Sequence, residues 1–378
     1  MPASGAGAKG REPMRMWLCG DVMLGRGIDQ ILPHPGDPTL REAYVDDARD
    51  YVTLAERVNG PIDTPVPFDW PWGDALSVLR DYRADVGVVN LETSITRSDR
   101  FAAGKAVHYR MNPANLPCLT AAGPDVCVLA NNHVLDFGRE GLAETLAALS
   151  RGGLTSVGAG RDIVAAQQPA VVGSVGGARL VVSAVGSTSS GVPLDWAATP
   201  GRAGVDLIPS ESDAVAEALA DRVQRMKQPG DVLIVSVHWG PNWGYEVSAG
   251  EVRVAHRLID AGADVVFGHS SHHPRPIEVY RRKLILYGCG DFIDDYEGIT
   301  GYEKFRDDLR LLYLVSVESG TGYLEELRLV PMQARRMRLH HASDDDSEWM
   351  RANLDQIGRE FRTRVDRAGD GLLLRRLT

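Results

Sequence analysis

Short apolar runs alternate with amphipathic stretches from Met14 onward. The runs are rich in β-branched residues and often bounded by glycine, which is typical of buried strands: Met16–Cys19, Val86–Val89, Val126–Leu129, Leu180–Val185, Val232–Val237, Val265–Phe267 and Leu284–Tyr287. Apolar residues at helical spacing lie between them, over Gly141–Arg151, Asp213–Met226 and Val252–Ala261. This alternation predicts an α/β fold.

Two other segments depart from this rhythm. Leu311–Val317 and Leu324–Val330 predict adjacent strands joined by a glycine-containing turn, and a closing helix is expected near Ser347–Val365. Residues 33–72 are rich in proline around a predicted helical middle, Thr39–Val58. We expect this stretch to be an insertion, either a lid or binding loop or a surface excursion.

Composition narrows the class of protein. Hydrophobic residues make up 44% and charged residues 24% of the 378 residues, a mix that excludes wholesale disorder. The formal net charge of −10 argues against a nucleic-acid partner, because an acidic chain repels phosphate backbones. The four cysteines are scattered and form no C-x-x-C pair, so neither a disulfide framework nor a thiolate metal site is expected.

The amino terminus indicates the compartment. Residues 1–13 lack the apolar core of a signal peptide, and we interpret them as a disordered leader. No window approaches the ~20 apolar residues of a membrane span. We therefore expect a soluble, cytoplasmic protein without a membrane partner, in which residues 14–378 form a single domain.

Polar residues follow nearly every predicted strand. In open α/β sheets the carboxyl ends of the strands line the ligand crevice. Here these ends carry acids, amides and histidines, namely Asp21, Asn90 with Glu92, Asn131 to His133 with Asp136, His238, His269 with His272 and His273, and Asp291. Carboxylates, amides and imidazoles suit Mg, Ca, Mn, Fe or Zn, so a metal-assisted acid/base site is predicted.

Structural roles are the alternative for each residue taken alone. Asp21 can cap a helix, and Asn131 and Asn132 can be turn residues. Structural or solvent-exposed positions are expected for His256, His340 and His341, whereas His34 and His108 are undecided. Gly158-Ala159-Gly160 is an incomplete dinucleotide fingerprint, and the chain has neither a Walker A sequence nor a G-x-S-x-G elbow.

The ordered motifs resemble those of the CapA (poly-γ-glutamate synthesis protein) family, a branch of the calcineurin-like metallophosphatase fold. The matching residues run from about Met14 to Asp295: Gly20-Asp21-Val22-Met23-Leu24-Gly25-Arg26, Asn90-Leu91-Glu92, Ala130-Asn131-Asn132-His133 with Asp136 and Gly138, His238-Trp239-Gly240, and Gly268-His269 with His272. The resemblance implies a two-sheet sandwich flanked by helices. The first-motif histidine and the bridging aspartate of calcineurin-like phosphatases are absent, which favours one hard cation, Ca or Mg; a dinuclear centre would take Mn, Fe or Zn.

Within that family the chain resembles the soluble peptide epimerases of lasso-peptide biosynthesis. The resemblance implies inversion of the α-carbon of a C-terminal residue, tryptophan in the known example, by one base and one acid on opposite faces. A peptide is then the expected partner. A metal-dependent phosphoesterase or other hydrolase, and a non-catalytic protein of capsule-polymer (poly-γ-glutamate) synthesis, are the alternatives.

Roles can be assigned to the strand-end residues on this basis. We expect Asp21, Glu92, Asn132, His238 and His269 around the metal, and His133 and His272 as proton-transfer groups oriented by Asp136 and Asp291. Ligand and base are interchangeable in this assignment. Arg26 and Lys105 are candidates to hold a carboxylate or phosphate, with surface salt bridges as the alternative, which is favoured for Lys105. Trp239, Trp243 and Tyr245 can form an apolar platform or pack at the rim.

Overall fold

The larger of two mixed β-sheets contains the first and the last strand of the described residues, β1 and β21. The computed structural model describes residues 12–175, 177–369 and 371–377. Its larger sheet has the order β20-β21-β18-β17-β1-β2-β5-β6, with β16 beside β1 and β19 beside β18. The strands are β1 (Met14–Val22), β2 (Val86–Leu91), β5 (Val126–Val128), β6 (Thr155–Val157), β16 (Asp291–Ile293), β17 (Leu309–Val317), β18 (Leu324–Ala334), β19 (Leu339–His341), β20 (Thr363–Ala368) and β21 (Gly371–Arg376).

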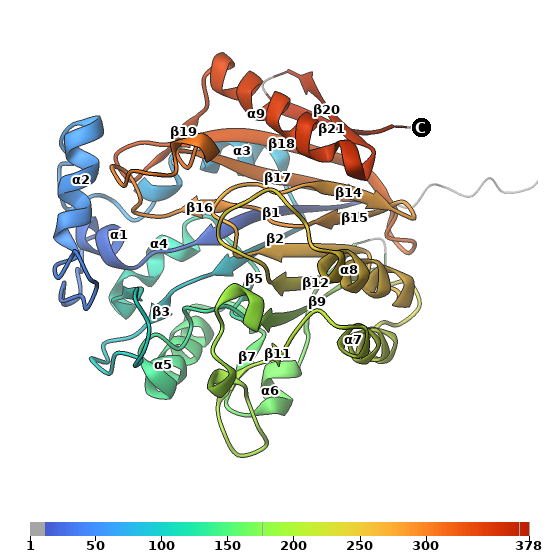
Figure 1. Cartoon of the computed structure of the whole chain (residues 1–378), viewed down its shortest axis with the longest axis horizontal. Helices are drawn as coiled ribbons and strands as arrows, with labels where there is room; N and C mark the ends of the chain where they lie inside the picture. Colours follow the sequence, from blue (N-terminus) through green and yellow to red (C-terminus); the bar gives the residue numbers. More distant parts are fainter. Residues whose placement is uncertain (1–11, 176, 370, 378) are drawn as a thin grey trace, which may run out of the picture.

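The smaller sheet packs against the larger one (Figure 1) and has the order β11-β9-β12-β13-β15-β14, with β8 beside β9. Its strands are β8 (Ala170–Val175), β9 (Ala178–Ser187), β11 (Leu207–Ile208), β12 (Val232–His238), β13 (Val265–His269), β14 (Ile277–Tyr280) and β15 (Lys283–Leu286). Two short pairs complete the strands: β3 (Ser94–Ile95) with β4 (Arg110–Met111), and β7 (Ala159–Gly160) with β10 (Gly204–Val205).

Helices flank the two sheets (Figure 1). They are α1 (Arg26–Ile31), α2 (Arg49–Asn59), α3 (Ala75–Tyr82), α4 (Leu116–Thr120), α5 (Gly138–Arg151), α6 (Ile163–Gln167), α7 (Asp213–Met226), α8 (Ala249–Ala261) and α9 (Asp344–Gly358). Helices α7 and α8 pack on each other and share an apolar cluster with one face of the smaller sheet, whereas α9 contacts β20, β18 and β21.

Alternation along β12 shows how the layers form. Val232 and Ile234 belong to the main core between the sheets, whereas Leu233, Val235 and Val237 pack beneath α7 and α8. Successive strand residues point to opposite faces, so a strand buried on both sides reads as a continuous apolar run. The predicted α/β sandwich of two sheets flanked by helices is confirmed.

The predicted β17–β18 hairpin is also confirmed, since the two strands pair antiparallel. Two predicted helices are wrong in extent. The closing helix ends at Gly358 rather than Val365, and Arg362 (φ 55°) turns the chain into β20. In the insertion only α2 is a long helix, because residues 39–48 form a loop closed by a hydrogen bond from Leu40 N to Asp46 O (2.8 Å).

The structure bears on some of the remaining expectations and leaves others untested. No helix in the described part of the chain combines the length and apolar character needed to cross a membrane. Most of the expected leader, residues 1–11, lies outside the described residues. The four cysteines are free and buried. The single-domain organisation and the cytoplasmic location stay predictions.

Candidate metal and acid/base site

Strand register brings the polar strand ends together. Asp21 of β1 lies opposite Asn90 of β2 and Asp291 of β16. In the other sheet, His238 of β12 lies opposite His269 of β13. His238 shares the face of β12 that carries Val232 and Ile234, so its side chain faces the larger sheet.

A close backbone approach fixes the position of Asp21. The Asp21 N–H donates to the carbonyl of Gly290 (2.9 Å). A Cβ on Gly20 would lie 1.7 Å from that carbonyl oxygen, so a side chain at residue 20 would push the two strand ends apart. Glycine at this position therefore holds Asp21 and Asp291 side by side.

Asp21, Glu92 and His238 form a group that can hold a metal ion. Each offers one ligand atom, and these atoms lie within 4.8 Å of one another in a buried setting. Among the described residues, neither ring nitrogen of His238 has a hydrogen-bond partner, and the same holds for His269 Nε2 and Asn132 Oδ1. Buried polar atoms normally have partners, so the unsatisfied acceptors in this set, one imidazole nitrogen of His238 among them, fit a bound cation.

Burial and neighbouring charge set the protonation of this group. Burial opposes ionisation of Asp21, but the hydrogen bond with His269 Nδ1 (2.8 Å) and the imidazole charges outweigh it, so the pKa of Asp21 is lowered. Burial and the adjacent Asp21 raise the pKa of Glu92 well above its usual value. Burial lowers the pKa of His238 to about 3. A cation would relieve the repulsion between the two carboxylates and favour the ionised form of both.

His133 and Asp136 form a hydrogen-bonded pair beside this group. His133 Nδ1 lies 2.6 Å from Asp136 Oδ2, and Lys105 Nζ lies 2.8 Å from Asp136 Oδ1. His133 Nε2 is 3.9 Å from Glu92 Oε1. Burial lowers the pKa of His133 to about 4, so the imidazole is neutral at pH 7 and can accept a proton.

A second pair joins His272 to Asp291. His272 Nδ1 lies 2.9 Å from Asp291 Oδ1, and its Nε2 lies 3.0 Å from Asn242 Nδ2. Burial opposes protonation of this imidazole, but Asp291 outweighs burial and raises the pKa of His272. One histidine therefore favours the neutral form and the other the charged form, which is the division of labour between a base and an acid.

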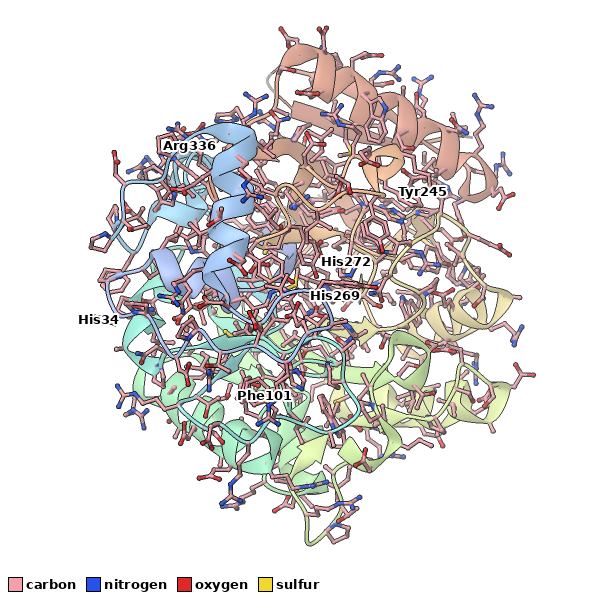
Figure 2. All side chains as sticks on the ribbon, turned by 60° about the vertical axis from the view of Figure 1, so that its left-hand side comes forward. His34, Phe101, Tyr245, His269, His272 and Arg336 are labelled. Atoms are coloured by element: carbon pink, nitrogen blue, oxygen red, sulfur yellow. The ribbon has the colours of Figure 1, made fainter. Side chains whose placement is uncertain are left out.

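Both pairs open onto one cavity of about 210 Å³. Its lining includes Glu92, His133 and His272, together with Lys105, Asn132, Tyr109, Asn242, Ser270 and Tyr296. His269 and His272 lie close together near the middle of the molecule (Figure 2). Ser270 has φ 95°, a strained conformation for a residue other than glycine, and its N–H lies 3.4 Å from Asp21 Oδ2.

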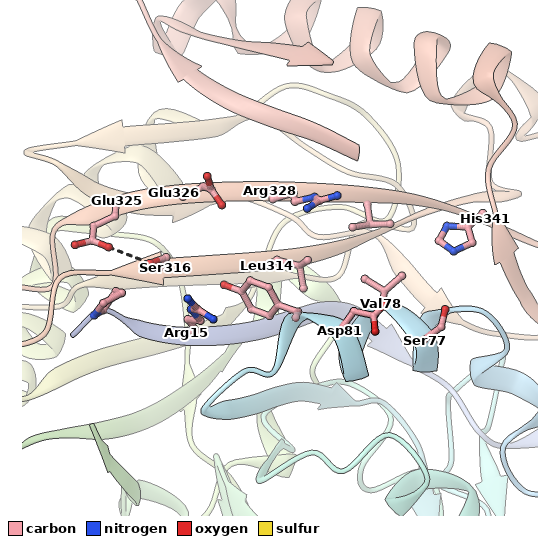
Figure 3. Close-up of a pocket in the computed structure, with 13 residues that line it drawn as sticks. Arg15, Ser77, Val78, Asp81, Leu314, Ser316, Glu325, Glu326, Arg328 and His341 are labelled. Carbon is pink, nitrogen blue, oxygen red and sulfur yellow. Dashed lines mark hydrogen bonds between the residues drawn. The ribbon is translucent and has the colours of Figure 1, made fainter. Parts of the chain in front are cut away.

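A larger groove, of about 620 Å³, lies over β17, β18 and α3 (Figure 3). Arg15, Tyr82, Glu326 and Arg328 contribute to its mixed lining, which includes none of the predicted site residues. Cavity size alone would therefore point away from the strand-end chemistry.

The structure brings the predicted site residues to one region, through the contacts described above. Their roles in metal binding and proton transfer stay predictions. Lys105 was expected at a surface salt bridge, but it contacts the carbonyl of Asn132 and pairs with buried Asp136. Arg26 is buried and already paired with Asp295 and Glu42, so it has no charge to spare for a substrate.

The expected aromatic platform is wrong for Trp239, whose fully buried indole donates to the carbonyl of Tyr287. Trp243 and Tyr245 are half-buried, and Trp243 contacts His272 with ring centroids 5.1 Å apart. The prediction missed four polar residues that line the cavity: Tyr109, Asn242, Ser270 and Tyr296. Ser270 sits between two predicted residues and could have been found from its position, whereas Tyr109 follows no predicted strand.

Comparison with known proteins gives a consistent assignment. The family model described as bacterial capsule synthesis protein PGA_cap matches residues 15–296. A probable polyglutamine synthesis accessory protein of Mycobacterium tuberculosis is 56% identical over 358 residues, which cover 94% of each chain. The PGA biosynthesis protein CapA of Bacillus subtilis is 26% identical over 309 residues, 81% of this chain and 68% of that one.

Among solved structures, a hypothetical protein from Thermus thermophilus has a TM-score of 0.44 at 16% identity, over 85% of this chain and 99% of that chain. The family match covers most of the chain and includes Asp21, Glu92, His133, His238 and His269. The chain belongs to the bacterial capsule synthesis protein PGA_cap family.

Proposed function

We propose that this chain is a metal-dependent hydrolase that acts on a glutamyl polymer, or on its precursor, during polymer synthesis. The relatives' names, polyglutamine synthesis accessory protein and PGA biosynthesis protein, support the substrate class. The family match supports the process. The chemistry of the strand-end residues supports the reaction type.

One observation carries the proposal: the buried group Asp21, Glu92 and His238 adjoins the cavity onto which the two histidine–carboxylate pairs open. Glu92 belongs to the buried group and also lines the cavity. A bound divalent cation would polarise the scissile carbonyl and acidify a water molecule. In this proposal neutral His133 accepts a proton and His272 returns one to the leaving amine; the lowered pKa of His133 and the raised pKa of His272 support these roles.

The ligand atoms of Asp21, Glu92 and His238 also favour some metal ions over others. Two carboxylates with one imidazole suit Mn, Fe or Zn, whereas Ca and Mg prefer oxygen ligands alone. We therefore place Mn, Fe or Zn ahead of Ca or Mg for this site. Elemental analysis of the purified protein, before and after chelation, decides between the two groups of metals.

The test combines metal content with turnover. Protein reloaded with Mn²⁺ is incubated with poly-γ-glutamate and with a γ-glutamyl tripeptide, and released amines are measured. We expect shortened chains with wild type, loss of bound metal and of turnover in Asp21→Asn, and neither loss in the control Asp63→Asn at an exposed carboxylate. Metal-replete protein that releases no amine from either substrate would contradict hydrolysis. Nitrophenyl phosphate esters tested in parallel would identify a phosphoesterase instead.

Peptide epimerisation is a second candidate, favoured by the two separate histidine–carboxylate pairs on one cavity. Two-base inversion needs such a pair on each face of the α-carbon. The same incubation in D₂O, extended to peptides ending in tryptophan, separates the two reactions. Deuterium at an α-carbon without amine release would favour the epimerase, and amine release without deuterium would exclude it.

A further inference from the structure

Two tyrosine hydroxyls meet in the wall of the cavity. Tyr109 Oη and Tyr296 Oη lie 2.6 Å apart. The Tyr109 ring packs edge-to-face on His133, with centroids 4.6 Å apart, and the Tyr296 ring packs on His272 at 5.3 Å. The hydrogen-bonded tyrosines therefore span the space between the two histidine–carboxylate pairs.

The neighbours of the two hydroxyl groups limit where each phenolic proton can be donated. Either hydroxyl can donate in the bond between the two tyrosines; when the Tyr296 hydroxyl donates to Met23 Sδ (3.7 Å), Tyr109 is the donor to Tyr296. A thioether sulfur is a weak acceptor. Among the described contacts, one phenolic proton at the cavity wall is thus satisfied only weakly, and a substrate oxygen would be a better acceptor.

A buried cation lies behind the two rings. The Arg26 guanidinium carbon is 4.5 Å from the Tyr109 ring centroid and 5.6 Å from that of Tyr296. Asp295 and Glu42 hold Arg26 in this position. The guanidinium packs against both rings and helps to fix their positions. Burial raises the pKa of Tyr109 and of Tyr296 well above the usual value, so both stay protonated.

We propose that the Tyr109–Tyr296 pair is a substrate-binding subsite that donates a hydrogen bond from Tyr296 to a carboxylate oxygen of a glutamyl unit. Its substrate class rests on the proposed function. Such a bond would hold the unit between His133 and His272. Tyr109 is a positioning residue, because it orients the Tyr296 hydroxyl without being the donor itself.

The test uses Tyr→Phe substitutions, which remove one oxygen and keep the ring. Wild type, Tyr109→Phe, Tyr296→Phe and the double variant are titrated calorimetrically with a γ-glutamyl tripeptide and, separately, with inorganic phosphate. Tyr44→Phe is the matched control, because Tyr44 is 99% exposed. Mn²⁺ affinity and thermal unfolding are measured on each protein to show that the fold and the metal group are unchanged.

Tyr296→Phe should weaken tripeptide binding about tenfold or more, as expected for a hydrogen bond to a charged group. The double variant should be within about twofold of Tyr296→Phe, because the two hydroxyls act as one unit. The Mn²⁺ affinity of each tyrosine variant should stay within about twofold of wild type, and so should the tripeptide affinity of the control Tyr44→Phe. A structural role alone would change unfolding and leave tripeptide affinity untouched.

Four outcomes would overturn the subsite or separate it from the proposed function. Equal tripeptide affinity in wild type and Tyr296→Phe overturns it, as does metal-loaded wild type that binds no tripeptide. Tyrosine-dependent binding of phosphate but not of tripeptide overturns the carboxylate assignment. Tyrosine-dependent tripeptide binding without hydrolysis supports the subsite and refutes the hydrolase.

Discussion

Individual residues were predictable where chemistry follows a strand. Asp21, Glu92 and His238 were found because each lies at or just past the carboxyl end of a buried apolar run, and such ends converge in a sheet. Tyr109 and Tyr296 were missed because they reach the cavity from segments that carry no such pattern. The sequence also contains no information about which nitrogen of a histidine is left without a partner.

His273 gives a residue-scale prediction for pH. Its Nε2 accepts from the Gly244 N–H (3.0 Å) and its Nδ1 lies 3.1 Å from the carbonyl of Pro274, a pattern that requires the neutral ring. Burial, with the nearby positive Arg275 and His272, lowers the pKa of His273 to about 4. The ordinary value is about 6.5, so between these values the unfolded chain binds the proton first.

The contribution of His273 to stability is therefore complete above pH 6.5 and is lost as the pH falls toward 4. The free energy of unfolding should fall by up to roughly 3 kcal/mol over this range from His273 alone. His273→Asn keeps a donor at the position of Nδ1 for the Pro274 carbonyl and cannot titrate, so its urea-unfolding profile against pH should be flatter. The same slope in wild type and variant would contradict the prediction; exposed His341→Asn is the control.

Elements were predicted well where the apolar run is unambiguous and poorly where tertiary contacts end a helix. The prediction for Val232–Val237 is confirmed by β12 to within one residue. Apolar residues at helical spacing continue past Gly358, yet Thr363 hydrogen-bonds the carbonyl of Ile277 (2.8 Å) and belongs to β20. The local hydrophobic pattern cannot predict this contact, because Ile277 lies 86 residues earlier in the chain.

Helix α8 supports an element-scale prediction about its capping box. Ser248 Oγ accepts from the Glu251 N–H (3.2 Å), and Glu251 accepts from the Ser248 N–H (2.7 Å). Glu251 also binds Arg275 (2.5 Å), whose side chain is 0% exposed. Ser248→Ala should cost about 1 kcal/mol of unfolding free energy, the usual loss of a cap.

Glu251→Ala should cost more, about 3 to 5 kcal/mol, because it leaves the Arg275 charge buried and unpaired. Chemical denaturation of both variants against wild type measures the difference. Equal losses would show that the cap, and not the buried ion pair, is what Glu251 contributes.

At the scale of the whole molecule, the site depends on two sheets meeting. Asp21 and Glu92 come from the larger sheet, and His238 and His269 from the smaller one. The order of strands along the chain was predictable, but their pairing was not. β1 pairs with β17, which begins nearly three hundred residues later, and the local sequence of either strand does not indicate which strand it pairs with. The resemblance to a known family supplied the sandwich arrangement.

Metal binding should therefore stabilise the sandwich as a whole. A ligand that binds only the folded state at 100 times its dissociation constant adds about 2.7 kcal/mol. Mn²⁺ at that concentration should raise the Tm of the chelated protein, and EDTA should reverse the rise. In Asp21→Asn the Mn²⁺-dependent rise should vanish, whereas Asp63→Asn should keep it; a rise that persists in Asp21→Asn would place the ion elsewhere. Differential scanning calorimetry provides both measurements.

The hydrogen bond between Asp21 and His269 joins residues 248 positions apart. A ribosome adds about 5 to 20 residues per second, so roughly 10 to 50 s separate the synthesis of the two partners. During that time Asp21 is a solvated carboxylate on the nascent chain, because its hydrogen-bonding partner His269 has not yet been synthesised. The centre therefore cannot assemble before His269 has been synthesised, and a chain released earlier would carry only half of the group and bind no substrate.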